Sequence, residues 1–271
     1  MMTPTILRNG FQGGRLAGFL PALILSLAPA LQAQGDCTDA NLMGTYGIQS
    51  SGLNTTGAQA GPFASIGRFF SYGDGTAAAS DTISQAGVIS RRAMSVTYAV
   101  NPDCTFSAAF TPVLGPAFRV QGSLVDAGKE VMFLLSDPGP AIVGSMKRVG
   151  NLAAAPCTNT DLRGTYGLRS SAAGSVASGS STAPIALVSS VFADGEGNYT
   201  ETQTASVNGQ IVRATYTGAY QVNPDCTGSL ILLNPTYGLS TGDFILVDGG
   251  REIRLIATNP GQVSSGLATR R

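Results

Sequence analysis

The sequence predicts an all-β protein made of two tandem antiparallel up-and-down β-barrels of about eight strands each. Three observations predict this fold. The chain nearly repeats itself, each copy carries one pair of cysteines, and the second copy alternates short β-forming segments with tight turns. Each copy has roughly 110 residues, which is long enough to bury a core of its own. A pair of β-sandwiches is the alternative fold.

The repeat is clearest in two motifs that occur once in each copy. Leu-x-Gly-Thr-Tyr-Gly stands at residues 42–47 and 162–167, and Val-Asn-Pro-Asp-Cys-Thr stands at 100–105 and 222–227. Between and after the motifs, further residues match at a constant offset: Phe70 and Phe192, Arg91 and Arg213, Glu130 and Glu252, Arg148 and Arg270. We therefore expect a first barrel repeat at 37–148, a linker at 149–156 and a second barrel repeat at 157–271.

The first 33 residues are typical of an export signal peptide. Arg8 and Arg15 supply positive charge, an apolar stretch runs from Leu16 to Leu31, and a small residue, Ala33, ends an acceptable cleavage site. A membrane anchor is the rival interpretation, but the stretch is shorter than the roughly 20 residues that a bilayer span needs. We expect an exported protein, in the periplasm or outside the cell, with no membrane span after removal of residues 1–33.

The charge and composition limit the kinds of partner. Residues 1–33 hold two of the 16 basic residues and none of the 16 acidic ones, so the remaining chain is slightly acidic. Such a chain has no basic surface for nucleic acid and no polybasic patch for a membrane. Its many glycines suit an exported all-β protein with tight turns. Partners are otherwise unknown, and a small lipophilic ligand is the one we consider.

The cysteines fit an oxidising compartment. An even number of cysteines in an exported chain indicates disulfides. Four cysteines allow three pairings, and the repeat favours Cys37 with Cys104 and Cys157 with Cys226, because these close loops of nearly equal length within each copy. Zinc binding is the alternative, but the chain has neither paired Cys-x-x-Cys spacing nor any histidine.

The strands are clearest in the second copy. From Arg213 to Val222, tyrosines and small residues alternate with polar residues, which is the period of a strand with one wet and one packed face. The other predicted strands of this copy are Thr165–Ser170, Ile185–Ala193, Tyr199–Val207, Ser229–Leu233, Asp243–Val247, Glu252–Ala257 and Val263–Thr269. Because Ser229–Leu233 is apolar on both faces, we expect it to be buried against the other copy.

Short turn-forming segments join these strands. They are Asp194–Gly197, Asn208-Gly209, Asn223–Asp225, Asp248–Gly250 and Asn259–Gly261. Eight consecutive strands with tight turns form a meander, and closure into a barrel removes its two exposed edges. In this arrangement each disulfide ties the start of the first strand to the turn between the fourth and fifth strands, across one end of the barrel.

The pattern Cys…Leu-x-Gly-Thr-Tyr-Gly…Val-Asn-Pro-Asp-Cys-Thr…Pro-Gly-x-Val-x-Ser-Gly resembles a family of secreted bacterial proteins of unknown function. The resemblance covers nearly the whole chain after residue 33 and is best in the second copy. It implies small disulfide-pinned β-barrels, one or two per chain, and it brings no activity. The first copy departs from the pattern at Ala127–Met132, and Phe106 stands where the second copy has Gly228.

No catalytic, cofactor-binding or metal-binding residues stand out in the sequence. The chain has no histidine, which excludes a Ser-His-Asp triad and a histidine-ligated zinc. It has no tryptophan either, so a sugar-stacking surface would need tyrosine or phenylalanine. We therefore expect no cofactor.

A few polar residues that recur in both copies deserve separate interpretation. Arg91 and Arg213 are weak ligand candidates, because an arginine inside a barrel could bind a ligand, but an exposed or cross-strand-paired arginine is favoured. Asp248 is expected to start a turn through its side chain. Glu252 and Arg251 are expected to be exposed charges on a strand.

Asp194–Asn198 resembles an oxygen-rich calcium loop but lacks the later bidentate glutamate, so a hairpin turn is favoured. The repeated tyrosines are expected to fill the core, with their hydroxyls at the barrel rim: Tyr46, Tyr98, Tyr166 and Tyr220.

These observations lead to three hypotheses on function. The first is an exported non-enzymatic two-barrel protein with a structural or interaction role. The second is a carrier of a small lipophilic ligand, since Ala214 and Gly218 leave space inside the barrel, whereas Tyr216 and Tyr220 occupy it. The third, which rests on fold analogy alone, is a barrel enzyme of the allene oxide cyclase kind.

Overall fold

The computed structural model describes residues 36–57, 59–150, 155–172, 184–234 and 238–271. Residues Gln34–Arg271 belong to one compact unit. The predicted signal peptide at 1–33 lies outside the described residues, as do residues 151–154 of the predicted linker. Within the described part of the chain, no helix has the length and apolar character needed to cross a bilayer.

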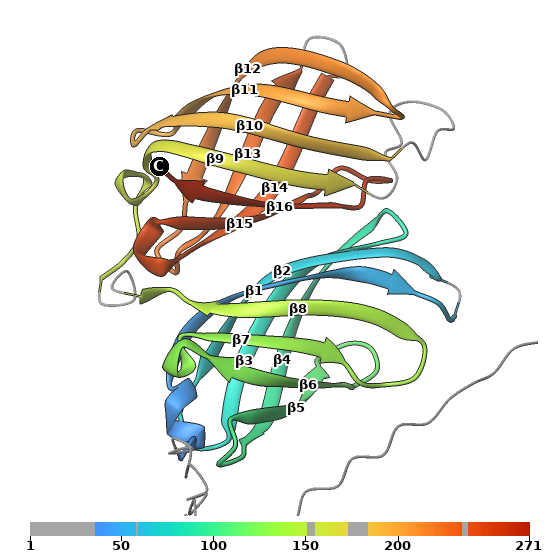
Figure 1. The fold of residues 1–271 in the computed structure, drawn as a ribbon, viewed down its shortest axis with the longest axis vertical. Coiled ribbons are helices and arrows are strands. Elements are labelled where there is room, and N and C mark those ends of the chain that lie inside the picture. Colours follow the sequence, from blue (N-terminus) through green and yellow to red (C-terminus); the bar gives the residue numbers. More distant parts are fainter. Residues whose placement is uncertain (1–35, 58, 151–154, 173–183, 235–237) are drawn as a thin grey trace, which may run out of the picture. The chain divides into compact units, whose positions relative to one another are not determined.

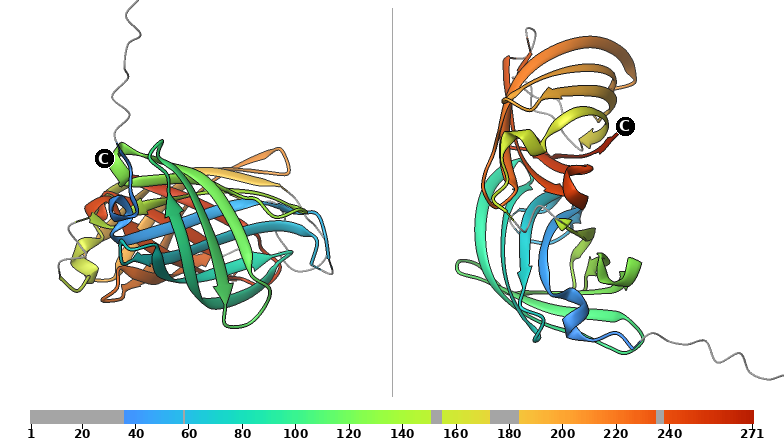
Figure 2. Two further views of the ribbon diagram at one scale, coloured as in Figure 1. Left: turned by 90° about the horizontal axis from the view of Figure 1, so that it is seen from below. Right: turned by 90° about the vertical axis from the view of Figure 1, so that its left-hand side faces the viewer.

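Two closed antiparallel barrels of eight strands each make up the fold (Figures 1 and 2). The first barrel consists of β1 (Gly44–Asn54), β2 (Gly61–Ser71), β3 (Thr76–Gln85), β4 (Val88–Val100), β5 (Thr105–Pro112), β6 (Phe118–Val125), β7 (Glu130–Leu135) and β8 (Pro140–Arg148). The second consists of β9 (Arg163–Ala172), β10 (Ile185–Asp194), β11 (Asn198–Val207), β12 (Gln210–Val222), β13 (Thr227–Asn234), β14 (Gly238–Val247), β15 (Glu252–Ala257) and β16 (Ser264–Arg270). Pairing of β1 with β8 and of β9 with β16 closes the sheets. The predicted fold class is confirmed.

Aromatic rings form the central part of the core of the first barrel. Side chains that alternate along the strands point into it, as expected for a closed sheet. Phe69 contacts Tyr46, Tyr98 and Phe110 with ring centroids 6.2 to 6.3 Å apart. Phe106 and Tyr98 lie at a similar distance. These residues belong to one buried cluster.

The hairpin turns have the chemistry that the sequence predicts. Asn208 and Gly209 both adopt positive φ, 49° and 82°, which a tight turn between β11 and β12 requires. In the turn before β11, Asp194 Oδ1 accepts hydrogen bonds from the backbone N–H groups of Glu196, Gly197 and Asn198. Bonds from the side chain and backbone of Asn198, together with the other turn amides, lower the pKa of Asp194 to about 2. This carboxylate therefore closes a hairpin.

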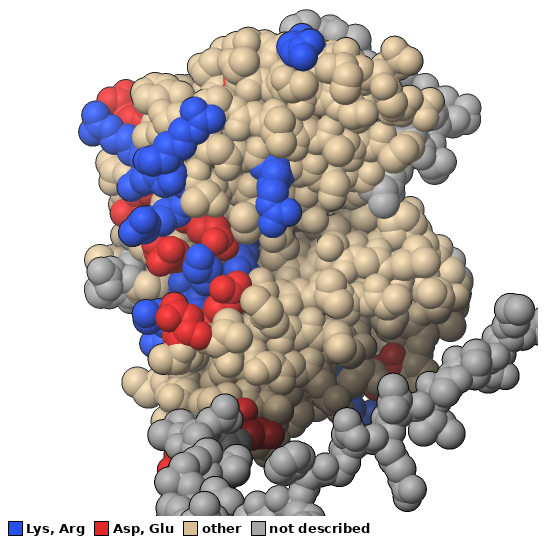
Figure 3. All heavy atoms as spheres, in the orientation of Figure 1, with Lys and Arg blue, Asp and Glu red and all other residues tan. Residues whose placement is uncertain are grey.

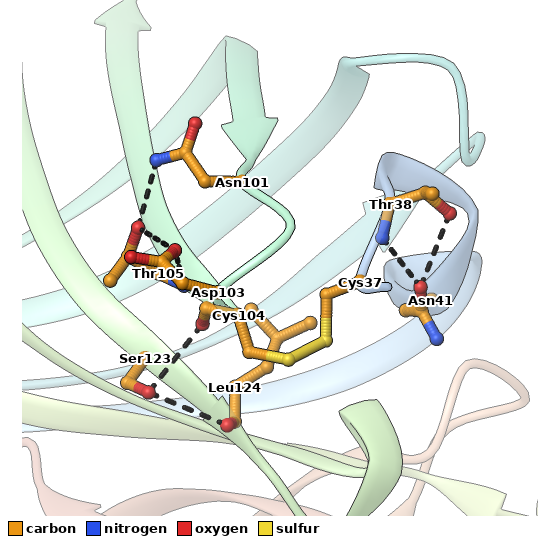
Figure 4. Close-up of a disulfide and its surroundings, with 9 residues drawn as sticks. All are labelled: Cys37, Thr38, Asn41, Asn101, Asp103, Cys104, Thr105, Ser123 and Leu124. Atoms are coloured by element: carbon orange, nitrogen blue, oxygen red, sulfur yellow. Dashed lines mark hydrogen bonds between the residues drawn. A yellow bond between two sulfur atoms is a disulfide. The ribbon is translucent and has the colours of Figure 1, made fainter. Parts of the chain in front are cut away.

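A disulfide fastens a short 3-10 helix across one end of each barrel. The bonds are Cys37–Cys104 and Cys157–Cys226, the pairing that the sequence predicts. Figure 4 shows Cys37, just before helix η1 (Asp39–Leu42), joined to Cys104 in the turn between β4 and β5. In the second barrel η4 (Asn159–Asp161) takes the same place.

Each of these 3-10 helices also hydrogen-bonds to the end of a strand. The side-chain oxygen of Asp39 accepts from the Val100 amide at 2.7 Å, and that of Asn159 accepts from the Val222 amide at 2.8 Å. The disulfide and these bonds hold the entering segment against the barrel end.

The four repeated tyrosines are buried. Their hydroxyls form hydrogen bonds near the barrel ends that carry the disulfides. Tyr46 donates to the Gly128 carbonyl at 2.6 Å and Tyr166 to the Gly250 carbonyl at 3.1 Å. Tyr220 donates to the Leu162 carbonyl at 2.8 Å, and the hydroxyls of Tyr98 and Ser71 are 2.6 Å apart. The expectation of core tyrosines with hydroxyls at the rim is confirmed.

The two barrels share an apolar interface. Ile66 on the outer face of β2 belongs to the same buried cluster as Ile245 and Val247 of β14 and Ile256 of β15. Gly47 of β1 allows this approach, because a Cβ at that position would lie 2.5 Å from a Val247 methyl group. Residues from the two sequence copies therefore form one continuous core.

The prediction that Ser229–Leu233 is buried against the other copy is wrong. On β13, Ile231 and Leu233 are 45% and 60% exposed. The outer faces of β14 and β15 provide the interface in its place. Alternation separates the inner from the outer face of a strand, but it does not say which outer face meets the neighbouring barrel.

A charged network lies in the same interface. Arg254 on β15, with a side chain only 2% exposed, donates to Glu252 Oε1 at 3.0 Å and to the Ser145 carbonyl at 2.7 Å, and pairs with Glu130 at 3.3 Å. Lys147 of the first barrel contacts Glu252 Oε2 at 2.7 Å. Figure 3 shows acidic and basic side chains gathered on one part of the surface, while most of that face carries neither.

Glu252 is therefore not the exposed strand charge that the sequence predicts. Burial favours its neutral form, but the hydrogen bond from Lys147 and the charge of Arg254 outweigh burial and lower the pKa of Glu252. Arg251 is exposed as expected. Asp248 does lie in a turn, where its carbonyl accepts from the Arg251 amide, while its carboxylate lies 3.6 Å from Lys147 Nζ.

Loss of a disulfide should destabilise the barrel that contains it. The bond Cys157–Cys226 closes a loop of 69 residues, and the chain-entropy model assigns such a loop about 4 kcal/mol. We expect the double variant Cys157→Ser/Cys226→Ser to melt at a clearly lower temperature than the parent, measured by circular dichroism. Equal melting temperatures of the parent with and without reductant would contradict this.

Removal of Arg254 should weaken the interface. Arg254→Met leaves Glu252 buried with Lys147 as its remaining cation, and breaking such a buried pair costs about 3 kcal/mol. Chemical denaturation should show this loss. Arg251→Met, three residues away and exposed, is the matched control and should be close to neutral; similar losses in both variants would show that the network does not hold the barrels.

Candidate functional site

The interior of the second barrel is the candidate functional site. It holds a cavity of about 160 Å³. The walls are mostly apolar and come from strands all around the barrel, and they include Leu168, Leu187, Val191, Tyr199, Leu230, Leu232, Phe244, Ile253 and Leu255. A mostly apolar hollow with few polar groups is the usual form of a small-molecule site.

Two glycines in the barrel wall make room for aromatic rings that border this interior. Gly218 and Gly228 lie on the inner face, and aromatic rings pack over them: a Cβ on Gly218 would lie 2.3 Å from the Tyr199 ring, and one on Gly228 would lie 2.2 Å from the Phe244 ring. At the position of Gly228 the first copy has Phe106, which is buried in its core.

Glu201 is the one acidic residue among those that border this cavity. Alternation along β11 places it on the inner face with Tyr199, opposite Tyr216 of β12 and Val191 of β10. It is only 6% exposed. Burial raises the pKa of Glu201, and the nearby Ser189 hydroxyl offsets part of that effect. No cation pairs with its carboxyl among the described residues.

Two further polar residues lie beside Glu201. Gln203 borders the cavity and stands directly opposite Ser189 in the pairing of β11 with β10. Ser189 is 8% exposed, and its hydroxyl makes no hydrogen bond of normal geometry to a described residue. Buried hydroxyls nearly always have such a partner. The second barrel therefore holds a short polar strip beside a mostly apolar cavity, and the Ser189 hydroxyl in this strip has no hydrogen bond of normal geometry.

The first barrel has a larger cavity of about 460 Å³ toward one end. Its lining includes Ile48, Phe63, Ile83, Met94, Phe133 and Ile142. It also contains an acid, Asp81 of β3, but this acid is paired with Arg92 of β4. The guanidinium donates through Nε and Nη2 to the two carboxylate oxygens at 2.9 and 2.6 Å. The charge in this cavity is balanced inside the barrel.

Neither weak ligand candidate from the sequence faces a barrel interior. Arg91 projects from the outer face of β4 and donates to Asp243 of the second barrel at 2.9 Å, with a side chain that is 68% exposed. Arg213 is exposed on β12. The favoured interpretation, an exposed or paired arginine, agrees with these positions, and a ligand role for either residue stays a prediction. Asp243 also accepts from Thr82 Oγ1 at 2.7 Å, so Arg91 takes part in the contact between the barrels.

Sequence reasoning missed Glu201, although a signal was present. In the run Tyr199–Ala205 the odd positions are Tyr, Glu, Gln and Ala, and the even positions are all threonine. Tyr199 and Ala205 mark the packed face, so an acid at 201 had to lie on that face as well. A carboxyl on the packed face of a barrel strand is unusual enough to merit attention.

Comparison with known proteins adds little to this geometry. No protein-family model and no curated protein matches the chain. A solved structure with some similarity is a protein of unknown function from the DUF3598 family of Nostoc punctiforme PCC 73102, at 13% identity and a TM-score of 0.24. The alignment covers 88% of this chain and 98% of that one. Nothing about the function of this chain follows from it.

The buried acid should make stability depend on pH. Burial raises the pKa of Glu201 above its ordinary 4.5, so the folded state holds the proton more tightly than the unfolded state. The stabilisation is present below about pH 4.5 and is lost as the pH rises through the folded pKa. Glu201→Gln cannot ionise, so its stability relative to the parent should increase from about pH 4 to about pH 8 in urea unfolding. A constant difference across that range would contradict the raised pKa.

Proposed function

We propose that this chain is an exported, non-enzymatic two-barrel protein that binds a small lipophilic molecule inside a barrel. One observation carries the proposal: the closed second barrel keeps an apolar cavity of about 160 Å³ at its centre. Space on this scale is sufficient for a ligand, because an engineered apolar cavity of about 150 Å³ binds benzene.

A purely structural role explains the cavity less well. Each unfilled cavity in a core reduces stability by about 24 cal/mol per Å³. The first copy has the larger side chains Phe106 and Phe110 at the matching positions, both buried, so larger side chains are compatible with this barrel design. The second copy has Gly228 and Leu232 at these positions. Retained space inside a barrel favours a binding role over a structural or interaction role.

Export is part of the same proposal. Two disulfides suit an oxidising compartment, the periplasm or the outside of the cell. The signal-like residues 1–33 and the resemblance to secreted bacterial proteins of unknown function support the same location.

One observation favours the barrel-enzyme hypothesis as a second candidate. Glu201 borders an apolar cavity and has a raised pKa, which is the environment that lets a carboxylic acid act as a proton donor at neutral pH. Reproducible turnover of a substrate by the purified protein, abolished in Glu201→Gln, would establish this role in place of simple binding.

Binding can be tested with a neutral hydrophobic fluorescent dye and small aromatic molecules on the purified chain without residues 1–33. We expect toluene to raise the melting temperature, since a ligand bound to the folded state stabilises it. The cavity-filling variant Leu230→Trp should abolish the effect, and Ile231→Trp, whose side chain faces outward on the same strand, should preserve it. No effect of any small apolar molecule, and no ligand in native mass spectra of protein from its source, would refute a binding role.

A further inference from the structure

The two barrels differ in whether a buried acid has a cationic partner. In the first barrel Asp81 stands directly opposite Arg92, and the two form a bidentate ion pair. At the matched positions the second barrel has Gln203 opposite Ala214, so the cation is missing. The acid of the second barrel, Glu201, lies one inward-facing position away, where the first copy has Ala79. The second barrel therefore contains a buried acid without the partner that the first barrel provides.

An acid in this position is costly unless something bonds to it. A buried polar group without a partner costs about 1 to 3 kcal/mol. Glu201 is only 6% exposed, and the polar group beside it is the Ser189 hydroxyl, which makes no hydrogen bond of normal geometry. A toluene-like ligand would fill the cavity but offer no hydrogen bond to either group. A ligand with an oxygen atom could accept a hydrogen bond from a protonated carboxyl or from Ser189.

The charge of the ligand follows from the surroundings. An amine would have to lose its hydration and also ionise Glu201, and an ion pair in an apolar interior often fails to repay that desolvation. A neutral oxygen of the ligand can accept a hydrogen bond from the neutral carboxylic acid, so neither partner has to carry a charge into the apolar interior. Burial already favours the neutral carboxyl, because the walls around it are leucine, valine, phenylalanine and tyrosine.

We propose that the second barrel is a specific site for a small, neutral, mostly apolar molecule with a single hydroxyl or carbonyl group, which Glu201 and Ser189 bind through its oxygen. The ligand has about the size of a substituted benzene ring, as the volume of about 160 Å³ allows. This inference rests on the proposed binding function and adds the identity of the polar contact.

Three probes of nearly equal size test the proposal: toluene, benzyl alcohol and benzylamine. Their dissociation constants are measured by calorimetry on the purified chain without residues 1–33. We expect benzyl alcohol to bind about tenfold more tightly than toluene, as one net hydrogen bond of about 1.4 kcal/mol implies, and benzylamine to bind more weakly than benzyl alcohol.

Variants locate the contact. Glu201→Gln keeps a hydrogen-bonding group and should retain most of the preference for benzyl alcohol, whereas Glu201→Leu should remove it and leave toluene binding intact. Thr202→Leu, on the exposed face of the same strand, is the matched control and should bind all three probes like the parent. Melting curves of each variant confirm that it is folded.

The outcomes separate this inference from the proposed function. If none of the three probes binds the parent, the binding function of this barrel is refuted together with the inference. If toluene and benzyl alcohol bind equally well, and Glu201→Leu changes neither, the barrel binds apolar molecules but the oxygen contact is wrong. If benzylamine binds most tightly and Glu201→Gln abolishes its binding, the ligand is cationic and the neutral class is overturned.

Discussion

Closure of each sheet is the constraint on which the rest of the structure depends. Because β1 pairs with β8 and β9 with β16, no strand in either barrel has a free edge, and side chains must alternate between an enclosed interior and an outer face. The volume inside a barrel of eight strands is nearly fixed. How much of that volume is filled then depends on the inward-facing side chains. Both barrels keep part of it open, with a cavity of about 460 Å³ in the first barrel and about 160 Å³ in the second, although Phe106 and Phe110 of the first are replaced by glycine and leucine in the second.

The sequence contained most of the information on the barrels and little on how they meet. Period-two alternation and turn residues such as Asn208-Gly209 are local signals, and they predicted the strands of the second copy and its closure. The interface depends on contacts between distant residues, so the same reasoning placed Ser229–Leu233 there and left Glu252 in solvent. Both expectations were wrong. Glu201 was visible as an acid on a packed face, but its lack of a cation is a property of the folded barrel.

The interface combines an apolar contact with a buried charge network, and the two have different effects. Ile66, Ile245 and Val247 exclude water and supply the general attraction between the barrels. Arg254 requires specific partners from both barrels: Glu252 on its own strand, Glu130 and the Ser145 carbonyl. A one-residue shift of β15 would leave a buried guanidinium without acceptors, at a cost of several kcal/mol. The network therefore favours one arrangement of the apolar surfaces over similar ones.

A buried glutamate has a lowered pKa at the interface and a raised pKa inside the second barrel. Glu252 is buried with two cations, and its pKa falls; Glu201 is buried without one, and its pKa rises. A carboxylate held by arginine and lysine has its hydrogen bonds satisfied within the protein, as Asp81 has with Arg92. A protonated carboxyl in an apolar cavity still has a donor to offer. Of the buried acids in the described part of the chain, Glu201 is therefore the one suited to an external oxygen, and the cavity beside it provides the space for such a ligand.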